Sequence, residues 1–368
     1  MKCIFTGGGT LGHTNPAIAV AEKIKKTQSD AEIVFVMREG GPENAEVLKR
    51  GFTVKEIPAK GLERGNIIDN MHTGAVALRA VFKCVSIIKK YKPDFVFGTG
   101  GYVAFAPLIA GLIKGIPTFV HESNSTPGLV TKISVKLGAI PLASTEAAEK
   151  HLASKKECRV VGTPLLSDFG TMTRDEARSR LKIDKDKIFI VSFGGSGGSE
   201  ILNKIIMDLM NDRSKKRSQI IHLHATGEKY FSAAKEKYEN LARGNGGQRI
   251  VPRIENMAVH MSAADIVICR CGAGTIAELS SVERAAILIP SPNVTDNHQY
   301  ENGKRLADKG AAIMIKEKDL TKESLAEKIL LLSQSERLRR RLEENVAALK
   351  KVDAADAVAD ILIKSIKN

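Results

Sequence analysis

Tryptophan is absent from this sequence, and aromatic residues make up only 5% of its 368 residues. Since proteins that bind nucleic acid commonly stack bases on aromatic side chains, this scarcity and the lack of a nucleic-acid-binding motif argue against a nucleic-acid partner. Long apolar runs are also missing. The longest, Val103 to Ile113, is far shorter than the roughly 20 residues that a membrane-spanning helix needs. A strand pattern begins at Lys2, which leaves no room for a signal peptide, so we expect a cytosolic protein that can still touch a membrane.

Cysteine is scarce as well. The five cysteines are odd in number, and no two of them are spaced as C-x-x-C. Three of them stand in apolar runs that are typical of buried strands or helices. We therefore expect neither a disulfide framework, nor secretion, nor a structural metal site.

The charge that is present is mostly positive. Lysine and arginine number 56 against 42 acidic residues, which gives a net charge of +14. A hydrophobic fraction of 43% with 27% charged residues excludes a disordered chain. The basic excess predicts an anionic partner, such as a phosphorylated substrate or an acidic membrane surface.

Short β-branched runs alternate with longer helical patterns along the chain. The candidate strands are 3–6, 32–37, 53–57, 94–98 and 117–121, then 187–193, 219–225, 265–269, 286–290 and 311–315. Such alternation is typical of parallel sheets built by right-handed crossovers. We therefore predict an α/β protein of two doubly wound, Rossmann-like domains that face each other across a cleft.

The expected domain limits follow from the same pattern. An N-terminal domain is predicted over residues 1–162 and a C-terminal domain over 163–340, with Gly162-Thr163-Pro164 at the joint. The last stretch, 341–368, reads as a helix that packs across both domains.

A glycine loop follows the first predicted strand. Gly7, Gly9 and Gly12 match the G-x-G-x-x-G fingerprint of dinucleotide-binding proteins, and Glu39 could serve as its ribose acid. More generally, glycines let backbone N–H groups approach a phosphate, and a helix predicted to begin near Thr14 to Pro16 points its positive end there. A tight turn without a ligand is the other interpretation.

Polar residues gather at further strand ends of the first half. His13, beside the glycine loop, is a candidate general base near neutral pH or a partner of the helix N-cap. The loop Gly98 to Tyr102 places a second set of N–H groups at a helix start. His121 and Glu122 fit either a site or buried hydrogen bonding, whereas Asn124 reads as a ligand contact.

In the second half, small residues at Gly272 to Gly274 follow an apolar strand and open a helix that could bind a diphosphate. Glu278, about one turn further on, could accept hydrogen bonds from ribose hydroxyls or simply face solvent. The amide-rich segment His298 to Asn302 could form hydrogen bonds with sugar hydroxyls.

The segment Lys55 to Lys92 is basic and partly apolar, with eight Lys or Arg residues against three acidic ones. This combination suits an anionic membrane surface. An ordinary amphipathic helix with its apolar face in the core is equally compatible with it.

In order along the chain, these motifs resemble one family. The resemblance is carried by Gly8-Gly9-Thr10-x-Gly12-His13-x-x-Pro16-Ala17, Gly100-Gly101-Tyr102-Val103, His121-Glu122-Ser123-Asn124, Pro127-Gly128-Leu129, Gly162-Thr163-Pro164, Gly194-Gly195-Ser196, Gly272-Ala273-Gly274-Thr275 with Glu278, and Gln299-Tyr300-x-Asn302. The set resembles the lipid-linked muramoyl-pentapeptide N-acetylglucosaminyltransferases of bacterial peptidoglycan synthesis, in glycosyltransferase family 28.

The resemblance implies an inverting glycosyltransferase of the GT-B type. It would move N-acetylglucosamine from UDP-N-acetylglucosamine to the muramic acid 4-hydroxyl of lipid I, the undecaprenyl-diphospho-muramoylpentapeptide, and so make lipid II. It further implies a peripheral protein on the anionic cytoplasmic face of the cell membrane. The family has no D-x-D metal site, so no metal or cofactor is expected.

The resemblance also assigns residues. His13 is the candidate base, with Glu122 as its rival. The expected substrate-binding residues are Thr10, Leu11, Gly12, Tyr102, Asn124, Ser196, Ile254, Ala273, Gly274, Thr275, Ile276, Ala277, Glu278, Gln299 and Asn302. Within this set Asn124 would contact sugar, Ile254 would contact uracil through its main chain, and Glu278 would bind ribose. Gln299 and Asn302 would form hydrogen bonds with the hydroxyls of N-acetylglucosamine.

Three positions depart from the family pattern. Leu166 stands where an arginine directed at the nucleotide is usual, Leu11 where glycine or alanine is common, and His298 where many relatives have glutamine. Leu166 leaves a catalytically silent UDP-sugar-binding protein open as an alternative. The glycine fingerprint with Glu39 leaves an NAD-dependent oxidoreductase open as another.

Overall fold

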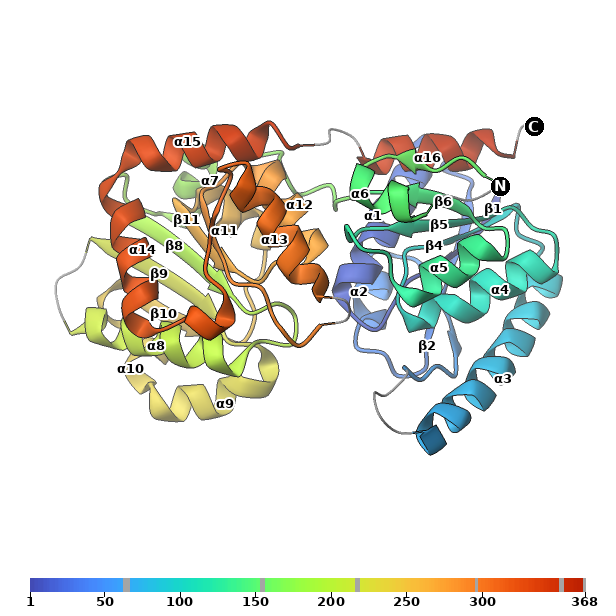
Figure 1. Cartoon of the computed structure of the whole chain (residues 1–368), viewed down its shortest axis with the longest axis horizontal. Helices are drawn as coiled ribbons and strands as arrows, with labels where there is room; N and C mark the ends of the chain where they lie inside the picture. The colour runs from blue at the N-terminus through green and yellow to red at the C-terminus, as the bar shows by residue number, and fades with distance from the viewer. Residues whose placement is uncertain (62–66, 153–155, 216–218, 295–296, 351–353, 367–368) are drawn as a thin grey trace. The chain divides into compact units, whose positions relative to one another are not determined.

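The computed structural model describes residues 1–61, 67–152, 156–215, 219–294, 297–350 and 354–366, and for 67–72 the backbone alone. The chain forms two compact units, Met1–Leu166 with Lys351–Asn368, and Ser167–Lys350 (Figure 1). The change of unit after Leu166 lies a few residues beyond the expected joint at Gly162 to Pro164.

The first unit is an α/β unit with one parallel sheet. Its strands are β1 (Lys2–Thr6), β2 (Glu32–Arg38), β3 (Thr53–Ile57), β4 (Phe95–Gly98), β5 (Thr118–Glu122), β6 (Ile140–Ala143) and β7 (Arg159–Val160). Its helices are α1 (Leu11–Thr27), α2 (Asn44–Lys49), α3 (Ile67–Tyr91), the 3₁₀ turn η1 (Tyr102–Ala104), α4 (Phe105–Ile113), α5 (Leu129–Lys136), α6 (Glu146–His151) and α16 (Ala354–Lys364). The strand order is β3-β2-β1-β4-β5-β6-β7.

Alternate residues of each central strand enter two different cores. Phe5 of β1 packs with the buried faces of α1 and α16, while its neighbour Ile4 packs with α3, α4 and α5. Both residues are at most 1% exposed. Because successive strand side chains point to opposite faces, an almost wholly apolar strand such as β1 requires helices on both sides of the sheet. The predicted three-layer, doubly wound arrangement is confirmed for this unit.

The second unit repeats this plan. Its strands are β8 (Ile188–Phe193), β9 (Ile220–Ala225), β10 (Gln248–Val251), β11 (Ile266–Cys269), β12 (Ala286–Leu288) and β13 (Ile313–Met314). Its helices are α7 (Arg174–Leu181), α8 (Glu200–Ser214), α9 (Glu228–Lys237), α10 (Glu239–Ala242), η2 (Asn245–Gly247), α11 (Met257–Ala263), α12 (Ala273–Val282), α13 (His298–Asp308), η4 (Glu317–Asp319), α14 (Lys322–Gln334) and α15 (Glu336–Ala347). The strand order is β10-β9-β8-β11-β12-β13, and the recorded strand pairs are parallel.

In each sheet the order of the strands reverses at one point. In the first unit this is between β1 and β4, and in the second it is between β8 and β11. The crevice outside the carboxyl ends of the strands at such a switch point is where open α/β sheets bind ligands. The glycine loops singled out in the sequence follow these four strands.

Some local expectations were wrong. The first helix begins at Leu11 rather than near Thr14, because the extended Thr10 caps it and its carbonyl accepts the N–H groups of His13 (3.1 Å) and Thr14 (3.2 Å). Strands β6, β7 and β10 were not predicted. Each has four residues or fewer, and β6 contains Pro141, so pairing with neighbouring strands forms them rather than local propensity.

The single C-terminal helix expected over 341–368 is also wrong. Helix α15 belongs to the second unit and α16 to the first, where Val358 and Leu362 are buried against the core that contains α1. Lys23 of α1 forms an ion pair of 2.6 Å with Asp356. The apolar spacing of the segment was read correctly as helical, but the break between its two helices was not.

A buried ion pair fastens α7 to the second sheet. The Arg178 guanidinium donates to Asp265 Oδ2 at 2.9 Å and to the carbonyls of Asp184 (2.9 Å) and Lys187 (2.5 Å). Asp265 Oδ2 also accepts the backbone N–H of Phe189 at 2.8 Å. Arg178 and Asp265 are only 6% and 5% exposed, so water cannot solvate either charge if the other residue is removed.

We expect Asp265→Ala to lower the free energy of unfolding by about 3–5 kcal/mol, because the Arg178 cation would stay buried without its counter-ion. Urea denaturation followed by circular dichroism measures this. The control is Glu239→Ala, which removes the exposed partner of Arg243 and should change the free energy by roughly 0.5 kcal/mol or less. Equal effects of the two substitutions would contradict the assigned role of Asp265.

Candidate functional site

The glycine loop after β1 is held in place by a carboxylate. The Gly9 N–H donates to Glu43 Oε1 at 2.8 Å, and Arg38 lies 3.8 Å from the other oxygen of Glu43. Glu43 is 2% exposed. Sequence reasoning missed this residue and chose Glu39, whose carboxylate instead accepts from Lys83 of α3 at 2.9 Å. The only signal in the sequence was a second acidic residue a few positions after the strand that precedes α2.

His13 lies in the first turn of α1, where two glycine loops meet. Its Nδ1 is 3.2 Å from Thr10 Oγ1, and its carbonyl accepts from Thr99 Oγ1 at 2.5 Å. A Cβ atom on Gly100 would lie 3.4 Å from the imidazole. At Gly101, φ is +77° and a Cβ atom would lie 2.2 Å from the Gly8 carbonyl oxygen, so only glycine fits this approach. The predicted loops 7–13 and 98–102 are therefore brought together.

Other predicted residues of this edge lie around the same loops. Thr10 and Gly12 are exposed, and Leu11 is partly exposed beside them. The Tyr102 ring lies against Gly9, where a Cβ atom would come within 2.8 Å of it. An exposed first helical turn covered on one side by an aromatic ring is open to a ligand.

Glu122 is surrounded by donors. Its Oε1 accepts from the backbone and side-chain amides of Asn124 at 3.0 and 3.1 Å. Its Oε2 accepts from the Gly128 N–H at 3.0 Å and from Thr131 Oγ1 at 2.8 Å. Four accepted bonds on a 5% exposed side chain make Glu122 the anchor of the loop that leads into α5. Among the described residues, none donates a hydrogen bond to Asn124 Oδ1.

His121 belongs to the interior. It is 0% exposed, its Nε2 lies 2.8 Å from the Gly162 carbonyl oxygen, and Ser144 Oγ is 3.2 Å from the same nitrogen. Burial lowers the pKa of His121. Of the two interpretations that the sequence allowed, the structure supports buried hydrogen bonding.

In the second unit, the start of α12 follows β11 directly. Gly272 occupies the N-cap and offers no side chain to the first turn. The first N–H groups of a helix have no acceptor within it, so those of Ala273, Gly274 and Thr275 are available to a ligand. A Cβ atom on Gly274 would meet nothing within 4 Å. The next residue, Ile276, faces the core and is 4% exposed.

Glu278 lies on the same helix, with Ala277 partly exposed beside it. Desolvation raises the pKa of its carboxyl to about 7. Within the described part of the chain, Glu278 has no hydrogen-bond or ion-pair partner. A partly buried carboxylate that has no partner is a strong acceptor for a hydroxyl that reaches it.

Gln299 and Asn302, near the start of α13, both bond to the loop before α12. Gln299 Oε1 accepts the backbone N–H of Ser291 at 2.9 Å and of Cys271 at 3.3 Å. Asn302 donates to the Cys271 carbonyl at 3.1 Å and is 3% exposed. Both residues therefore fix the loop before α12.

The two other predicted residues of this unit lie on separate loops. Ser196 is exposed in the glycine loop between β8 and α8. Ile254 follows β10, and its side chain is buried in the core at 5% exposure, so only its main chain can face a ligand.

Beneath the Ser196 loop, buried polar groups fix the start of α8. Ser192 Oγ lies 2.7 Å from His222 Nε2 and 2.8 Å from His224 Nδ1, and His224 Nε2 lies 3.1 Å from Asn203 Oδ1 in the first turn of α8. Burial lowers the pKa of His224 to about 3, so the ring is neutral at physiological pH. The network orients the helix that carries the loop.

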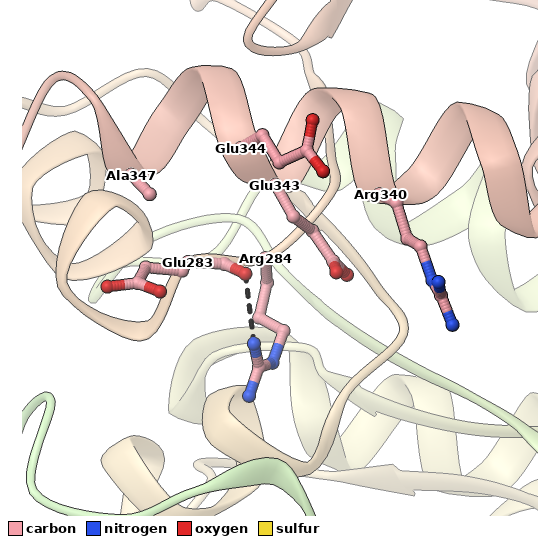
Figure 2. Close-up of a pocket in the computed structure, with 6 residues that line it drawn as sticks. All are labelled: Glu283, Arg284, Arg340, Glu343, Glu344 and Ala347. Carbon is pink, nitrogen blue, oxygen red and sulfur yellow. Dashed lines mark hydrogen bonds between the residues drawn. The ribbon is translucent and has the colours of Figure 1, made fainter.

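Pockets lined by described residues include two in the second unit. One of about 510 Å³ opens at the carboxyl edge and is lined by Ile201, Pro290, Ser291, Pro292, Asn297, Tyr300, Lys316, Glu317 and Lys318. The other, of about 250 Å³, lies where α12 ends, between Glu283, Arg284 and the charged face of α15 (Figure 2). It contains none of the predicted residues. The first pocket borders Gln299 through Ser291 and Tyr300.

Leu166, where an arginine was expected, packs partly buried against the core of the first unit. Its side chain therefore contributes to packing in that core. Among the described residues, no group of three or more His, Cys, Asp or Glu side chains is placed to hold a metal ion.

The chain matches two family models. The glycosyltransferase family 28 N-terminal domain matches residues 3–139, and the family 28 C-terminal domain matches residues 189–360. Among solved structures, the fold is similar to that of Acinetobacter baumannii MurG, with a TM-score of 0.74, 24% identity and 99% of each chain covered. It is also similar to Neisseria meningitidis UDP-GlcNAc 2-epimerase bound to UDP-GlcNAc, with a TM-score of 0.68, 12% identity, and 99% and 100% covered.

Full-length relatives carry one name, UDP-N-acetylglucosamine–N-acetylmuramyl-(pentapeptide) pyrophosphoryl-undecaprenol N-acetylglucosamine transferase. The protein of Thermoanaerobacter sp. (strain X514) is 37% identical over 100% of both chains. That of Acetivibrio thermocellus is 36% identical over 100% of this chain and 99% of its own. The expected fold class, two Rossmann-like parallel-sheet units of the GT-B type, is confirmed, and the chain belongs to glycosyltransferase family 28.

Proposed function

We propose that this chain transfers N-acetylglucosamine from UDP-N-acetylglucosamine to the muramic acid 4-hydroxyl of lipid I, with inversion at the anomeric carbon, and so makes lipid II. The observation that carries the proposal is full-length similarity, at 32–37% identity, to transferases named for this activity. The described contacts fit the chemistry that this reaction needs.

The donor would bind at the carboxyl edge of the second unit. The N–H groups of Ala273 to Thr275 would hold the diphosphate, and Glu278 would accept from the ribose. The Ile254 main chain would contact uracil, with Ser196 on the nucleotide side. The positive end of α12 would stabilise the charge that develops on the departing UDP, which is the task that a metal ion performs in other transferases. We therefore propose that the reaction needs no metal or cofactor.

The acceptor would bind at the edge of the first unit, where His13 acts as the base. Thr10 Oγ1 lies 3.2 Å from His13 Nδ1, and in the tautomer in which Nδ1–H donates to it, Nε2 would take the proton of the 4-hydroxyl. The resulting oxygen attacks the anomeric carbon while the bond from that carbon to the diphosphate oxygen breaks. Glu122, whose oxygens already accept four hydrogen bonds, would position Asn124 rather than accept this proton.

The similarity to named transferases contradicts the alternative of an NAD-dependent oxidoreductase.

A membrane surface is the third proposed partner. On α3, Leu78 and Phe82 are 59% and 66% exposed, and Ile113 at the end of the neighbouring α4 is 61% exposed. Exposed Arg79 and Lys114 accompany them. No described helix is long and apolar enough to cross a membrane. Apolar side chains with nearby cations suit the anionic surface in which lipid I is anchored, so we propose peripheral binding on the cytoplasmic face.

We expect the affinity for UDP-N-acetylglucosamine to rise about tenfold between pH 6 and pH 8, because ribose hydroxyls prefer the ionised Glu278 carboxylate and its pKa is about 7. Isothermal titration calorimetry measures the Kd, and two buffers of different ionisation enthalpy reveal the protons released. Glu278→Gln should bind the donor more weakly and lose both effects. The same Kd and proton release in the variant would remove Glu278 from the donor site.

Replacing the proposed base should slow catalysis without weakening donor binding. We expect His13→Ala to lower kcat by roughly two to four orders of magnitude, with the donor Kd nearly unchanged. Transfer of labelled N-acetylglucosamine to a lipid I analogue measures the rate. His151→Gln, an exposed histidine of α6, is the control and should keep full activity. A fully active His13→Ala protein would exclude His13 as the catalytic base. A wild-type chain that binds the donor but does not transfer the sugar would instead support the alternative of a catalytically silent UDP-sugar-binding protein.

The double substitution Leu78→Ser and Phe82→Ser should weaken sedimentation with phosphatidylglycerol vesicles, and the remaining binding should fall further as salt is raised. Donor Kd should not change. The control is Leu48→Ser, which removes an equally exposed leucine from α2. Wild-type vesicle binding by the double variant would place the membrane contact elsewhere.

A further inference from the structure

Arg270 is a buried cation at the centre of the carboxyl edge of the second sheet. It follows the last residue of β11, Cys269, and stands just before the N-cap of α12. Its side chain is 9% exposed, and that of its ion-pair partner Glu317 is 15% exposed. The proposed function gives this pair no direct part in binding or chemistry.

The contacts of Arg270 reach three other segments. Its guanidinium donates to Ser199 Oγ at 2.5 Å and to the Ile289 carbonyl at 3.2 Å, and it forms the ion pair with Glu317. Ser199 is the N-cap of α8 and ends the glycine loop of Ser196. Ile289 follows β12, and Glu317 follows β13 and opens η4.

One side chain therefore links the loops that follow β8, β11, β12 and β13, which are consecutive neighbours in the sheet. A planar guanidinium holds five donors on three nitrogens in fixed directions and can reach acceptors on separate segments, whereas a lysine carries its three donors on one nitrogen. A buried ion pair adds little to stability compared with apolar residues of the same size. Its value here lies in holding four loops in one arrangement.

Resting on the proposed function, we propose that Arg270 is a positioning residue for the sugar nucleotide. By joining the Ser196 loop, the loop before α13 and η4 to its own backbone, it sets the N-terminus of α12 where the donor diphosphate binds. Arg270 does not itself contact the donor, because Glu317 and Ser199 engage its guanidinium.

Four variants test this assignment through Michaelis constants for the donor and for a lipid I analogue. In Arg270→Met and in Glu317→Gln the donor KM should rise about 10-fold to 100-fold, because displaced loops misplace the diphosphate site, and the acceptor KM should not change. Ser199→Ala, a milder change, should raise the donor KM less. In Arg270→Lys the donor KM should lie between the Arg270→Met value and the wild-type value.

Glu317→Gln separates positioning from direct contact. If Arg270 bound the diphosphate itself, releasing it from Glu317 would lower the donor KM, and that result would overturn the proposal. A purely structural role would lower the melting temperature while leaving the donor KM unchanged, which would overturn it as well. Arg174→Met is the matched control, because Arg174 pairs with Glu343 near the pocket where α12 ends (Figure 2). It should change stability alone.

Calorimetric titration of the wild-type chain with UDP keeps the two hypotheses apart. Failure of wild-type binding or transfer would reject the proposed function. Normal wild-type behaviour together with wild-type donor KM values in folded Arg270→Met and Glu317→Gln proteins would reject the role of Arg270 alone.

Discussion

Both units depend on the same constraint, which is that parallel strands end at one edge of the sheet and the chain must turn there within a few residues. Each turn exposes backbone N–H groups that need acceptors. Gly9 finds one in Glu43, and Asn124 and Gly128 find theirs in Glu122. The first turns of α1, α8 and α12, which follow glycine loops, have no capping side chain. Their N–H groups are suited to an anion.

The carboxylates of the molecule differ in function because they differ in partners. Glu43 and Glu122 are buried, accept hydrogen bonds from backbone amides, and act as internal acceptors for loops. Glu317 neutralises a buried arginine. Glu278 combines partial burial with the lack of a partner among the described residues, and desolvation raises its pKa accordingly. Among these carboxylates, the one without a hydrogen-bond partner, Glu278, is therefore the one expected to bind a ligand.

Much of the fold could be predicted because it depends on local pattern. The runs around Phe5, Phe35 and Phe193 are apolar on both faces, as strands covered by helices on both sides must be. What local pattern could not show is pairing over long distances. The short strands β7 and β10 exist only because a neighbouring strand binds them, and α16 packs on α1 although more than 300 residues separate Lys23 from Asp356.

For the site, the order and spacing of the glycine motifs, His13 and Glu278 identified the family and the chemistry expected of it, because glycine loops and the residues beside them are contiguous in the chain. The tertiary structure decided which polar groups are already engaged. It showed that Glu43 rather than Glu39 serves the first loop, that the oxygens of Glu122 are occupied, and that Arg270 joins four loops. Each of these contacts joins residues that are far apart in the sequence, so the spacing of residues within a motif could not predict it.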